Sequence, residues 1–216
     1  MNKAILFILL LIPNTGSFAQ EKDFDKEIMI GVYAIGGWNI PVRLTTKFIT
    51  EETSPWYGYE SYSAGIKVSM MVFEKSGIEI ATCYSKHKIG FELSPPIYTE
   101  RKIYMETFRI ISIPITYKRY FQNNFFFNAG TIIDFKLKDE PIWVDAQSGF
   151  GLTFRAGKEI RIHNLILDIA PDIELHSLVP FITEDFQQRL FVGAIRIGIS
   201  YNLKSAKTKK NEVDEQ

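Results

Sequence analysis

The sequence predicts an all-β protein, an eight-stranded antiparallel up-and-down transmembrane β-barrel with short periplasmic turns and longer extracellular loops. Three observations lead to this prediction. Eight segments alternate with period two and keep one face apolar. The connections between them alternate between short and long, and aromatic residues gather near the ends of the apolar faces. The 17 Phe and 10 Tyr among 216 residues also favour strands over helices.

Composition excludes several classes of function. The formal net charge is zero, so the chain lacks the basic excess that neutralises phosphates in nucleic-acid binding. Cys83 is the single cysteine. An internal disulfide is therefore excluded, and so is a zinc site built from several thiolates.

The first 19 residues are predicted to be a cleaved signal peptide. Lys3 precedes a short apolar run, Ala4–Ile12, and the small-x-small pattern at residues 17–19 is typical of a signal peptidase site. The run is roughly half of the ~20 residues that a membrane-spanning helix needs. We expect the barrel to occupy residues 20–203. A charged flexible tail, residues 204–216, would follow it.

The eight predicted strands follow one another along the mature chain. Their approximate ranges are 28–38, 61–72, 78–87, 103–121, 124–136, 149–157, 164–176 and 191–203. The fifth has the clearest pattern, with Phe125, Phe127 and Phe135 on one face and Asn128 and Asp134 on the other. In the fourth, Arg109 interrupts the apolar face. Either a bulge or an extension beyond the membrane would explain this, and the sequence leaves both open.

The connections predict which end of the barrel lies outside the cell. Short turns are expected at residues 74–77, 122–124 and 163–164, and longer loops at 39–60, 91–102, 139–146 and 177–187. Outer-membrane barrels have short periplasmic turns and longer extracellular loops. We expect a protein or glycan partner to bind the loops at 39–60 and 91–102, where Ser54–Tyr59 is rich in aromatic residues.

Alternation by itself allows two opposite polarities. A soluble lipocalin-like carrier of a hydrophobic ligand places its apolar face inward, whereas a membrane barrel places it against lipid and fills the lumen with polar side chains. The rhythm of the connections favours the membrane barrel. A structural cluster of charges is then predicted in the lumen, and its members are Arg155, Asp168, Asp172, Glu174 and Arg196. Eight strands leave an interior just wide enough for side chains to fill, so we expect a plugged lumen and no open pore.

No catalytic, cofactor-binding or metal site is predicted. One group resembles the machinery of a rim-active lipid acyltransferase, namely His176 and Ser177 with Glu174 and Asp185 nearby. Adjacent residues of a strand point to opposite faces, so His176 and Ser177 are not expected to meet. The three histidines, His87, His163 and His176, are expected at both ends of the barrel, which argues against a shared metal site.

Two segments carry a resemblance to a known family. Residues 111–121 (ISIPITYKRYF) and 124–130 (NFFFNAG) resemble a recurrent core of the PorT-like outer-membrane β-barrel domain proteins of the Bacteroidota, and residues 149–157 look like their glycine-dotted sixth strand. The resemblance implies a location in the outer membrane, with its lipid as a partner, and insertion by the barrel assembly machinery. It implies no activity, although one member is associated with a secretion and gliding apparatus. Many such barrels end on an aromatic residue, whereas Tyr201 and Leu203 are followed here by the charged tail.

Overall fold

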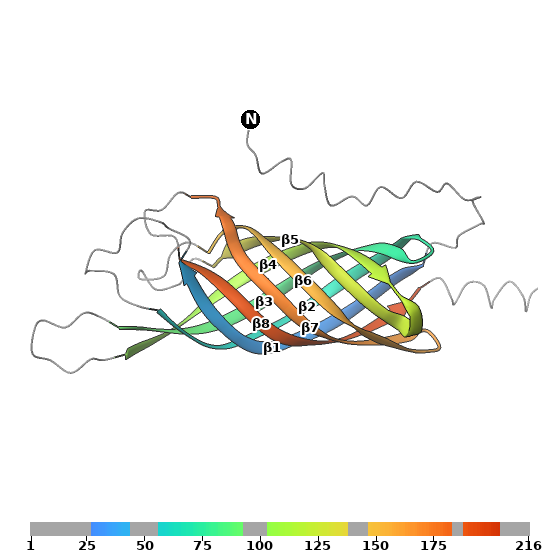
Figure 1. Ribbon diagram of the computed structural model, residues 1–216, viewed down its shortest axis with the longest axis horizontal. Coiled ribbons are helices and arrows are strands. Elements are labelled where there is room, and N and C mark those ends of the chain that lie inside the picture. Colours follow the sequence, from blue (N-terminus) through green and yellow to red (C-terminus); the bar gives the residue numbers. More distant parts are fainter. Residues whose placement is uncertain (1–26, 44–55, 93–102, 138–146, 183–187, 204–216) are drawn as a thin grey trace, which may run out of the picture.

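The protein is a closed antiparallel barrel. The computed structural model describes residues 27–43, 56–92, 103–137, 147–182 and 188–203. Figure 1 shows the strands winding around one axis. They are β1 (Ile28–Arg43), β2 (Trp56–Phe73), β3 (Ser76–Glu92), β4 (Ile103–Tyr120), β5 (Phe125–Lys136), β6 (Gly149–Ile162), β7 (Leu165–Pro180) and β8 (Gln188–Asn202). Within the described residues, no helix is long and apolar enough to cross a membrane.

Each strand pairs antiparallel with its neighbours in the sequence, and β1 closes the ring against β8. The closing ladder runs from Met29, opposite Asn202, to Arg43, opposite Gln188. A closed ring leaves no edge along the barrel wall, so backbone N–H and C=O groups bond between strands. This is the condition that a sheet must meet to stand in lipid. The predicted number and order of strands are confirmed.

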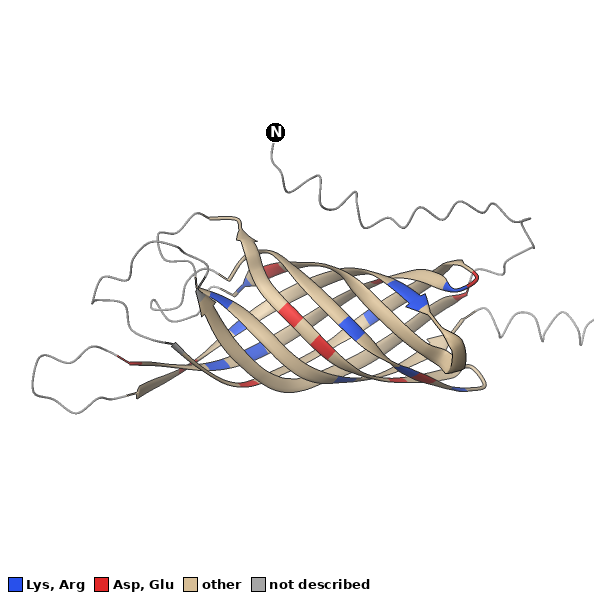
Figure 2. Cartoon of the chain, viewed as in Figure 1, with Lys and Arg blue, Asp and Glu red and all other residues tan. Residues whose placement is uncertain are grey.

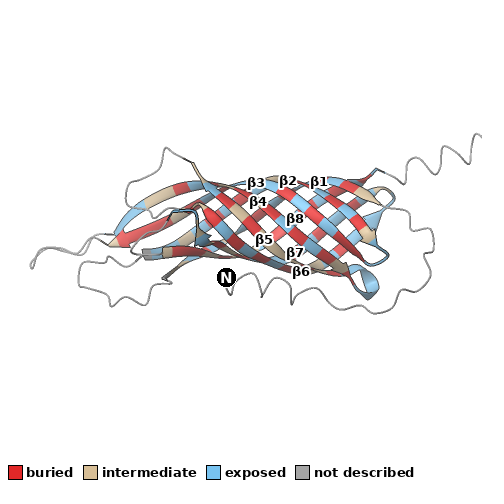
Figure 3. Cartoon of the chain, turned by 90° about the horizontal axis from the view of Figure 1, so that it is seen from above, coloured by how far each residue is buried: buried red, intermediate tan, exposed pale blue. Residues whose placement is uncertain are grey.

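Buried and exposed residues alternate along the strands, as the colours in Figure 3 show, because successive side chains of a strand point to opposite faces. On β8, Ile195 and Ile197 are 49% and 59% exposed, while Arg196 between them is 1% exposed. The same polarity holds on β2, where Ile66 is 63% exposed and Lys67 only 3%. Apolar residues therefore face outward and polar residues inward. A soluble carrier needs the reverse, so the lipocalin-like alternative is wrong.

Several strands are longer than the sequence predicted. The loop expected at residues 39–60 is shorter, because β1 continues to Arg43 and β2 begins at Trp56. β7 likewise continues to Pro180, into the loop expected at 177–187. The β4 ladders contain no register shift, so no bulge explains Arg109. The outward position of Arg109 is explained instead by the extension of β4 beyond β5. β4 pairs with β5 only from Ile110 onward, and among the described residues 103–108 pair with β3 alone.

Tight turns lie at the end of the barrel where β1 begins and β8 ends. The β2–β3 turn is only Glu74–Lys75, shorter than the predicted 74–77. The β4–β5 turn η1 (Gln122–Asn124) contains Asn123 with φ of 59°, and His163 in the β6–β7 turn has φ of 55°. Asparagine tolerates this left-handed conformation better than most residues. Leu203 donates its N–H to the carbonyl of Ile28 beside these turns.

Some predicted features lie outside the described residues. These are the signal peptide 1–19, the tail 204–216, residues 44–55 of the first long loop, residues 93–102 of the second, the loop 139–146, and residues 183–187 with Asp185.

Outward polarity predicts a depth-dependent response to charge. Ile197→Arg on the middle of β8 should lower the free energy of unfolding in lipid vesicles by about 2–4 kcal/mol, because it places a cation against acyl chains. Ile162→Arg is the control, because Ile162 is equally apolar and exposed but ends β6 beside a turn. It should cost at most about 1 kcal/mol. Urea titration of both variants measures the difference, and equal costs would contradict the assigned polarity.

Candidate functional site in the barrel lumen

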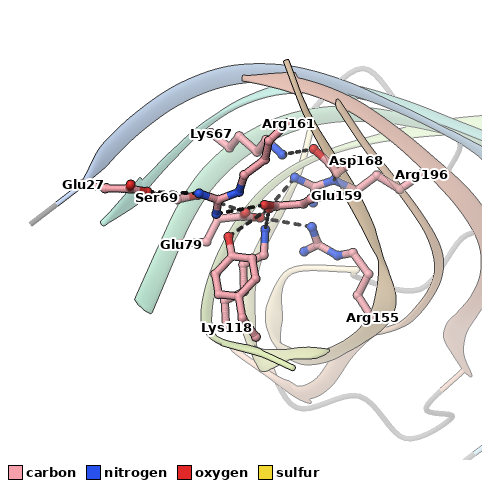
Figure 4. Close-up of polar contacts among 11 residues, drawn as sticks. Glu27, Lys67, Ser69, Glu79, Lys118, Arg155, Glu159, Arg161, Asp168 and Arg196 are labelled. Carbon is pink, nitrogen blue, oxygen red and sulfur yellow. Dashed lines mark hydrogen bonds and ion pairs between the residues drawn. The ribbon is translucent and has the colours of Figure 1, made fainter. Parts of the chain in front are cut away.

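At the centre of the lumen, one carboxylate accepts hydrogen bonds from two guanidinium groups. Glu79 on β3 accepts hydrogen bonds from Arg155 Nη1 at 3.0 Å and Arg196 Nη2 at 3.1 Å. Figure 4 shows the two arginines reaching Glu79 from β6 and β8. Ser69 on β2 donates to the second carboxylate oxygen at 3.1 Å. All three charged groups are at most 2% exposed, so this cluster ties four strands together across the lumen.

Two further carboxylates extend the central cluster. Asp168 on β7 forms an ion pair with Lys67 on β2 and lies 3.9 Å from Arg196 Nε. Asp172 lies 3.4 Å from Arg155 Nε and accepts a hydrogen bond from Thr153. These buried charges thus form one network in which cations and anions alternate. Ions removed from water need such partners of opposite charge.

The structure brings together four of the five residues in the predicted cluster. Arg155, Asp168, Asp172 and Arg196 lie around Glu79, whereas Glu174 forms its ion pair with His176. Glu79 lies within the third predicted strand, residues 78–87, but the sequence did not predict it as a member of the cluster. Its inward position was the only feature that could have pointed to this role. β3 is adjacent to neither β6 nor β8 in the sheet, so strand pairing does not predict that Glu79 contacts their arginines.

A second ion cluster occupies the end of the lumen near the turns. Glu159 accepts hydrogen bonds from Lys118 Nζ at 2.6 Å and from the Tyr120 hydroxyl at 2.9 Å. Arg161 Nη2 donates a hydrogen bond to the other carboxylate oxygen of Glu159 at 3.2 Å. Glu159 was missed because the alternation was followed only to Gly157, whereas β6 continues to Ile162. An apolar cluster accompanies these charges, formed by Met29, Met71, Tyr120, Phe126, Ile166 and Ala170.

The opposite half of the lumen is built around His176. Its Nδ1 lies 3.1 Å from Asp134 on β5, and its Nε2 lies 3.3 Å from Glu174. Asp134 also accepts hydrogen bonds from the Ser112 hydroxyl at 2.6 Å and the Ser177 N–H at 3.0 Å. Each ring nitrogen of His176 therefore faces a different carboxylate.

Ser177 contradicts the expectation that it would point away from His176. Both residues are buried, at 0% and 1% exposed. Ser177 has φ of 50°, and the β6–β7 ladder shifts register between Phe150 and Leu152. This irregularity turns two consecutive side chains toward the lumen, which strict alternation forbids.

His87 on β3 lies beside His176, with 5.4 Å between the ring centroids. Its nitrogens contact the hydroxyls of Ser61 at 2.6 Å and Ser85 at 2.9 Å. His163 lies at the far end, in the β6–β7 turn, so the predicted separation of the histidines is found. Over the residues that the structure describes, no group of three or more His, Cys, Asp or Glu side chains could hold a metal ion.

This arrangement offers little to nucleophilic catalysis. A general base needs an unprotonated nitrogen directed at the nucleophile. Both nitrogens of His176 face carboxylates, so neither is directed at Ser177. The Ser61–His87 contact has the right length, but the other partner of His87 is the Ser85 hydroxyl rather than an acid, and both Ser61 and His87 are buried.

Apolar side chains fill the lumen beyond the histidines, toward the long loops. They are Ile89, Phe108, Ile110, Leu190 and Val192, and none is more than 1% exposed. At the same level the side chain of Asn39 on β1 bridges β2 and β3, where the β2–β3 ladder shifts register between Gly58 and Ser61. Its amide donates to the carbonyls of Glu60 and Lys88, and its oxygen accepts the N–H of Tyr59.

Solved structures share this architecture. OprG from Pseudomonas aeruginosa, an outer membrane protein, superposes with a TM-score of 0.53 at 12% identity, covering 82% of this chain and 95% of that one. The fold is that of small outer-membrane barrels. The outer membrane protein AlkL gives 0.48 at 9% identity, covering 88% and 97% of the two chains. Ail of Yersinia pestis, solved with the heparin analogue sucrose octasulfate, gives 0.38 at 15%, covering 83% and 100%. No protein-family model and no curated protein matches the chain.

Removing the central carboxylate should strongly destabilise the barrel. Glu79→Gln leaves Arg155 and Arg196 buried without their shared counter-charge, and we expect a loss of about 3–5 kcal/mol in unfolding free energy. Glu60→Gln is the matched control, because Glu60 forms an exposed ion pair with Lys88 at 3.3 Å; it should cost less than about 1 kcal/mol. Urea unfolding in vesicles measures both. Similar small losses would show that the central cluster does not stabilise the fold.

Gly198 should be intolerant of even one methyl group. A Cβ at this position would overlap the Asp168 carboxylate and push it from Lys67. We expect Gly198→Ala to cost about 1–3 kcal/mol through overpacking. Gly193→Ala on the same strand is the control, because nothing lies within 4 Å of its added Cβ. Its unfolding curve should match that of the wild type, and equal shifts in both variants would refute the packing argument.

Proposed function

We propose that this chain is an integral outer-membrane protein whose lumen is closed to solutes and which acts at its extracellular rim, in a structural, adaptor or surface-interaction role. The observation that carries the proposal is the pairing of buried charges across the lumen. Arg155 and Arg196 reach Glu79 from the far wall, so their side chains occupy the path that a solute would take. An ion would have to break these pairs to pass.

Three features support the location. The outer surface is apolar along all eight strands. The start of β1 and the end of β8 lie at the same end of the barrel as the tight turns, and the fold is shared with outer-membrane proteins. The signal peptide expected at residues 1–19 would direct the chain across the inner membrane. Barrel assembly machinery would then insert it, with outer-membrane lipid as its surroundings.

The rim offers a contact surface. We call residues 56–60, 86–92 and 103–109 the rim extension. Figure 1 shows the end of β3 and the start of β4 projecting past the other strands. Ile103, Tyr104 and Met105 are 46–49% exposed there, and Tyr104 stacks on Phe91. Exposed apolar and aromatic side chains above a membrane suit a protein or glycan partner.

A link to a secretion apparatus is the finer part of the proposal. It rests on the resemblance of residues 111–121 and 124–130 to PorT-like proteins. These segments form β4 and β5, whose outward faces carry Ile115, Tyr117 and Phe125. In this chain the two resembling segments therefore form part of the barrel wall.

An enzymatic role is less well supported. A rim-active acyltransferase would need a base directed at its nucleophile and open to lipid, whereas His176 and Ser177 are buried and His176 faces two acids.

Conductance across a planar bilayer tests the closed lumen. The mature protein should insert without producing steady conductance steps. The double variant Arg155→Ala, Arg196→Ala serves as a comparison, because it removes the two side chains that cross the lumen and should produce small steps or more noise. Insertion is checked by the heat-dependent shift in gel mobility. Steady steps from inserted wild-type protein would refute the closed lumen.

A further inference from the structure

Asn128 on β5 is a buried polar side chain that the ion network of the lumen does not use. It is 0% exposed, and its place in the alternation of β5 directs it inward. Neither its Oδ1 nor its Nδ2 has a hydrogen-bond partner among the residues that the structure describes. A buried amide without partners destabilises a folded protein, so buried polar groups are almost always bonded. The Asn128 amide therefore requires a partner from outside the described chain.

Asn39 on β1 shows how the same side chain is satisfied elsewhere in the lumen. It is 1% exposed. Its Nδ2 donates to the carbonyls of Glu60 at 3.2 Å and Lys88 at 3.0 Å, and its Oδ1 accepts the N–H of Tyr59 at 3.3 Å. Burial in this barrel is thus compatible with a fully bonded asparagine, which sets Asn128 apart.

The position of Asn128 is between the two ion clusters. It lies opposite Lys118 on β4 and opposite Arg155 on β6. Lys118 belongs to the cluster near the turns and Arg155 to the central cluster, and Figure 4 shows both side chains in the lumen. Directly opposite residues on neighbouring strands have Cβ atoms about 4.5–5.5 Å apart. A small molecule on the Asn128 amide is therefore within reach of both clusters.

The central cluster also contains charged atoms that form no hydrogen bond within the described part of the chain. Arg155 Nε and Asp172 Oδ2 are 3.4 Å apart, and each lacks a hydrogen-bond partner. The same is true of Arg196 Nε and Asp168 Oδ1, which are 3.9 Å apart. Donors and acceptors are both left open here, as they are on Asn128. A ligand that satisfies this region has to donate and to accept.

The charge balance of the two clusters favours a neutral ligand. Figure 2 shows residues of both signs along the barrel. Each carboxylate of the clusters has a cation beside it, with Arg155 and Arg196 beside Glu79, Lys67 beside Asp168, Arg155 beside Asp172, and Lys118 beside Glu159. An added ion would be a further charge removed from water without its own counter-ion. Side chains fill most of an eight-stranded lumen, so the ligand also has to be small.

We propose that Asn128 binds a buried water molecule that joins the two ion clusters of the lumen. Water is neutral and small, and it both donates and accepts. Buried waters typically make about three hydrogen bonds to polar groups that lack other partners, and such bridges are nearly as favourable as direct bonds. The inference goes beyond the proposed function, because it makes the lumen hydrated at its centre whatever the role of the rim.

A crystal structure of the full mature chain in lipid, at a resolution that shows ordered waters, tests the site. We expect a water oxygen about 2.7–3.2 Å from an amide atom of Asn128 and within hydrogen-bond distance of Lys118 or Arg155. Asn39 is the matched control, because both hydrogens of its Nδ2 already bond carbonyls, and no water is expected on that atom. An Asn128 amide bonded to protein groups only, or without water beside it, would overturn the site.

The variant Asn128→Leu tests whether the amide holds the water. Leucine copies the branched shape of asparagine without its polar atoms. Crystals of the variant should lose this water, while the ion pairs of Lys118 with Glu159 and of Arg155 with Glu79 remain. Water retained at the same place would show that the ions bind it and would overturn the role of Asn128. The heat-dependent mobility shift checks that the variant folds, and the wild-type crystals decide the proposal if it does not.

Ion replacement separates water from a bound ion. Wild-type crystals are grown with bromide in place of chloride, and others with rubidium in place of sodium. We expect no anomalous signal beside Asn128 in either crystal. A bromide or rubidium peak there would overturn the assignment to water. Conductance measurements address the closed lumen separately, so failure of that proposal and failure of the water site are distinguishable.

Discussion

The structure depends on balancing charge inside a ring that has room for side chains only. A membrane barrel turns its polar face inward, so ionic groups have to be buried, and each needs a partner of opposite sign. Glu79 meets this constraint by accepting from two arginines that come from β6 and β8. Asp168 and Asp172 extend the pairing to Lys67 and Arg155. The network therefore joins strands that share no ladder, and it holds opposite walls at a fixed separation.

The lumen is divided into zones with different chemistry. Near the tight turns, Lys118 and Glu159 lie against an apolar cluster. In the other half His176 lies between two carboxylates, and beyond it the interior is apolar around Phe108 and Leu190. In these layers Glu79, Asp168 and Glu159 each lie beside a cation, and apolar clusters fill the interior near the turns and toward the long loops. This arrangement suits a rigid barrel wall.

The outer wall follows the opposite rule. Its large apolar side chains are exposed along every strand, and Lys88, one of its cations, forms an ion pair with Glu60. The rim extension carries the pairing of β3 with β4 past the level where β5 stops. The same strands therefore contribute to the lumen, the lipid-facing wall and the extracellular surface at different heights.

The sequence by itself determined the strands, their order and the direction of nearly every side chain, because period-two alternation is local and each strand pairs with its neighbour in the chain. Connection lengths further predicted the membrane polarity that Arg196 and Ile197 display. Only the tertiary structure decided which inward charges meet, since closure brings Glu79 to strands with which it has no sequence relation. It also decided the register that sets Asn128 between Lys118 and Arg155. The inward turn of Ser177 depends on a local irregularity with φ of 50°, and a strictly alternating pattern cannot encode such an exception.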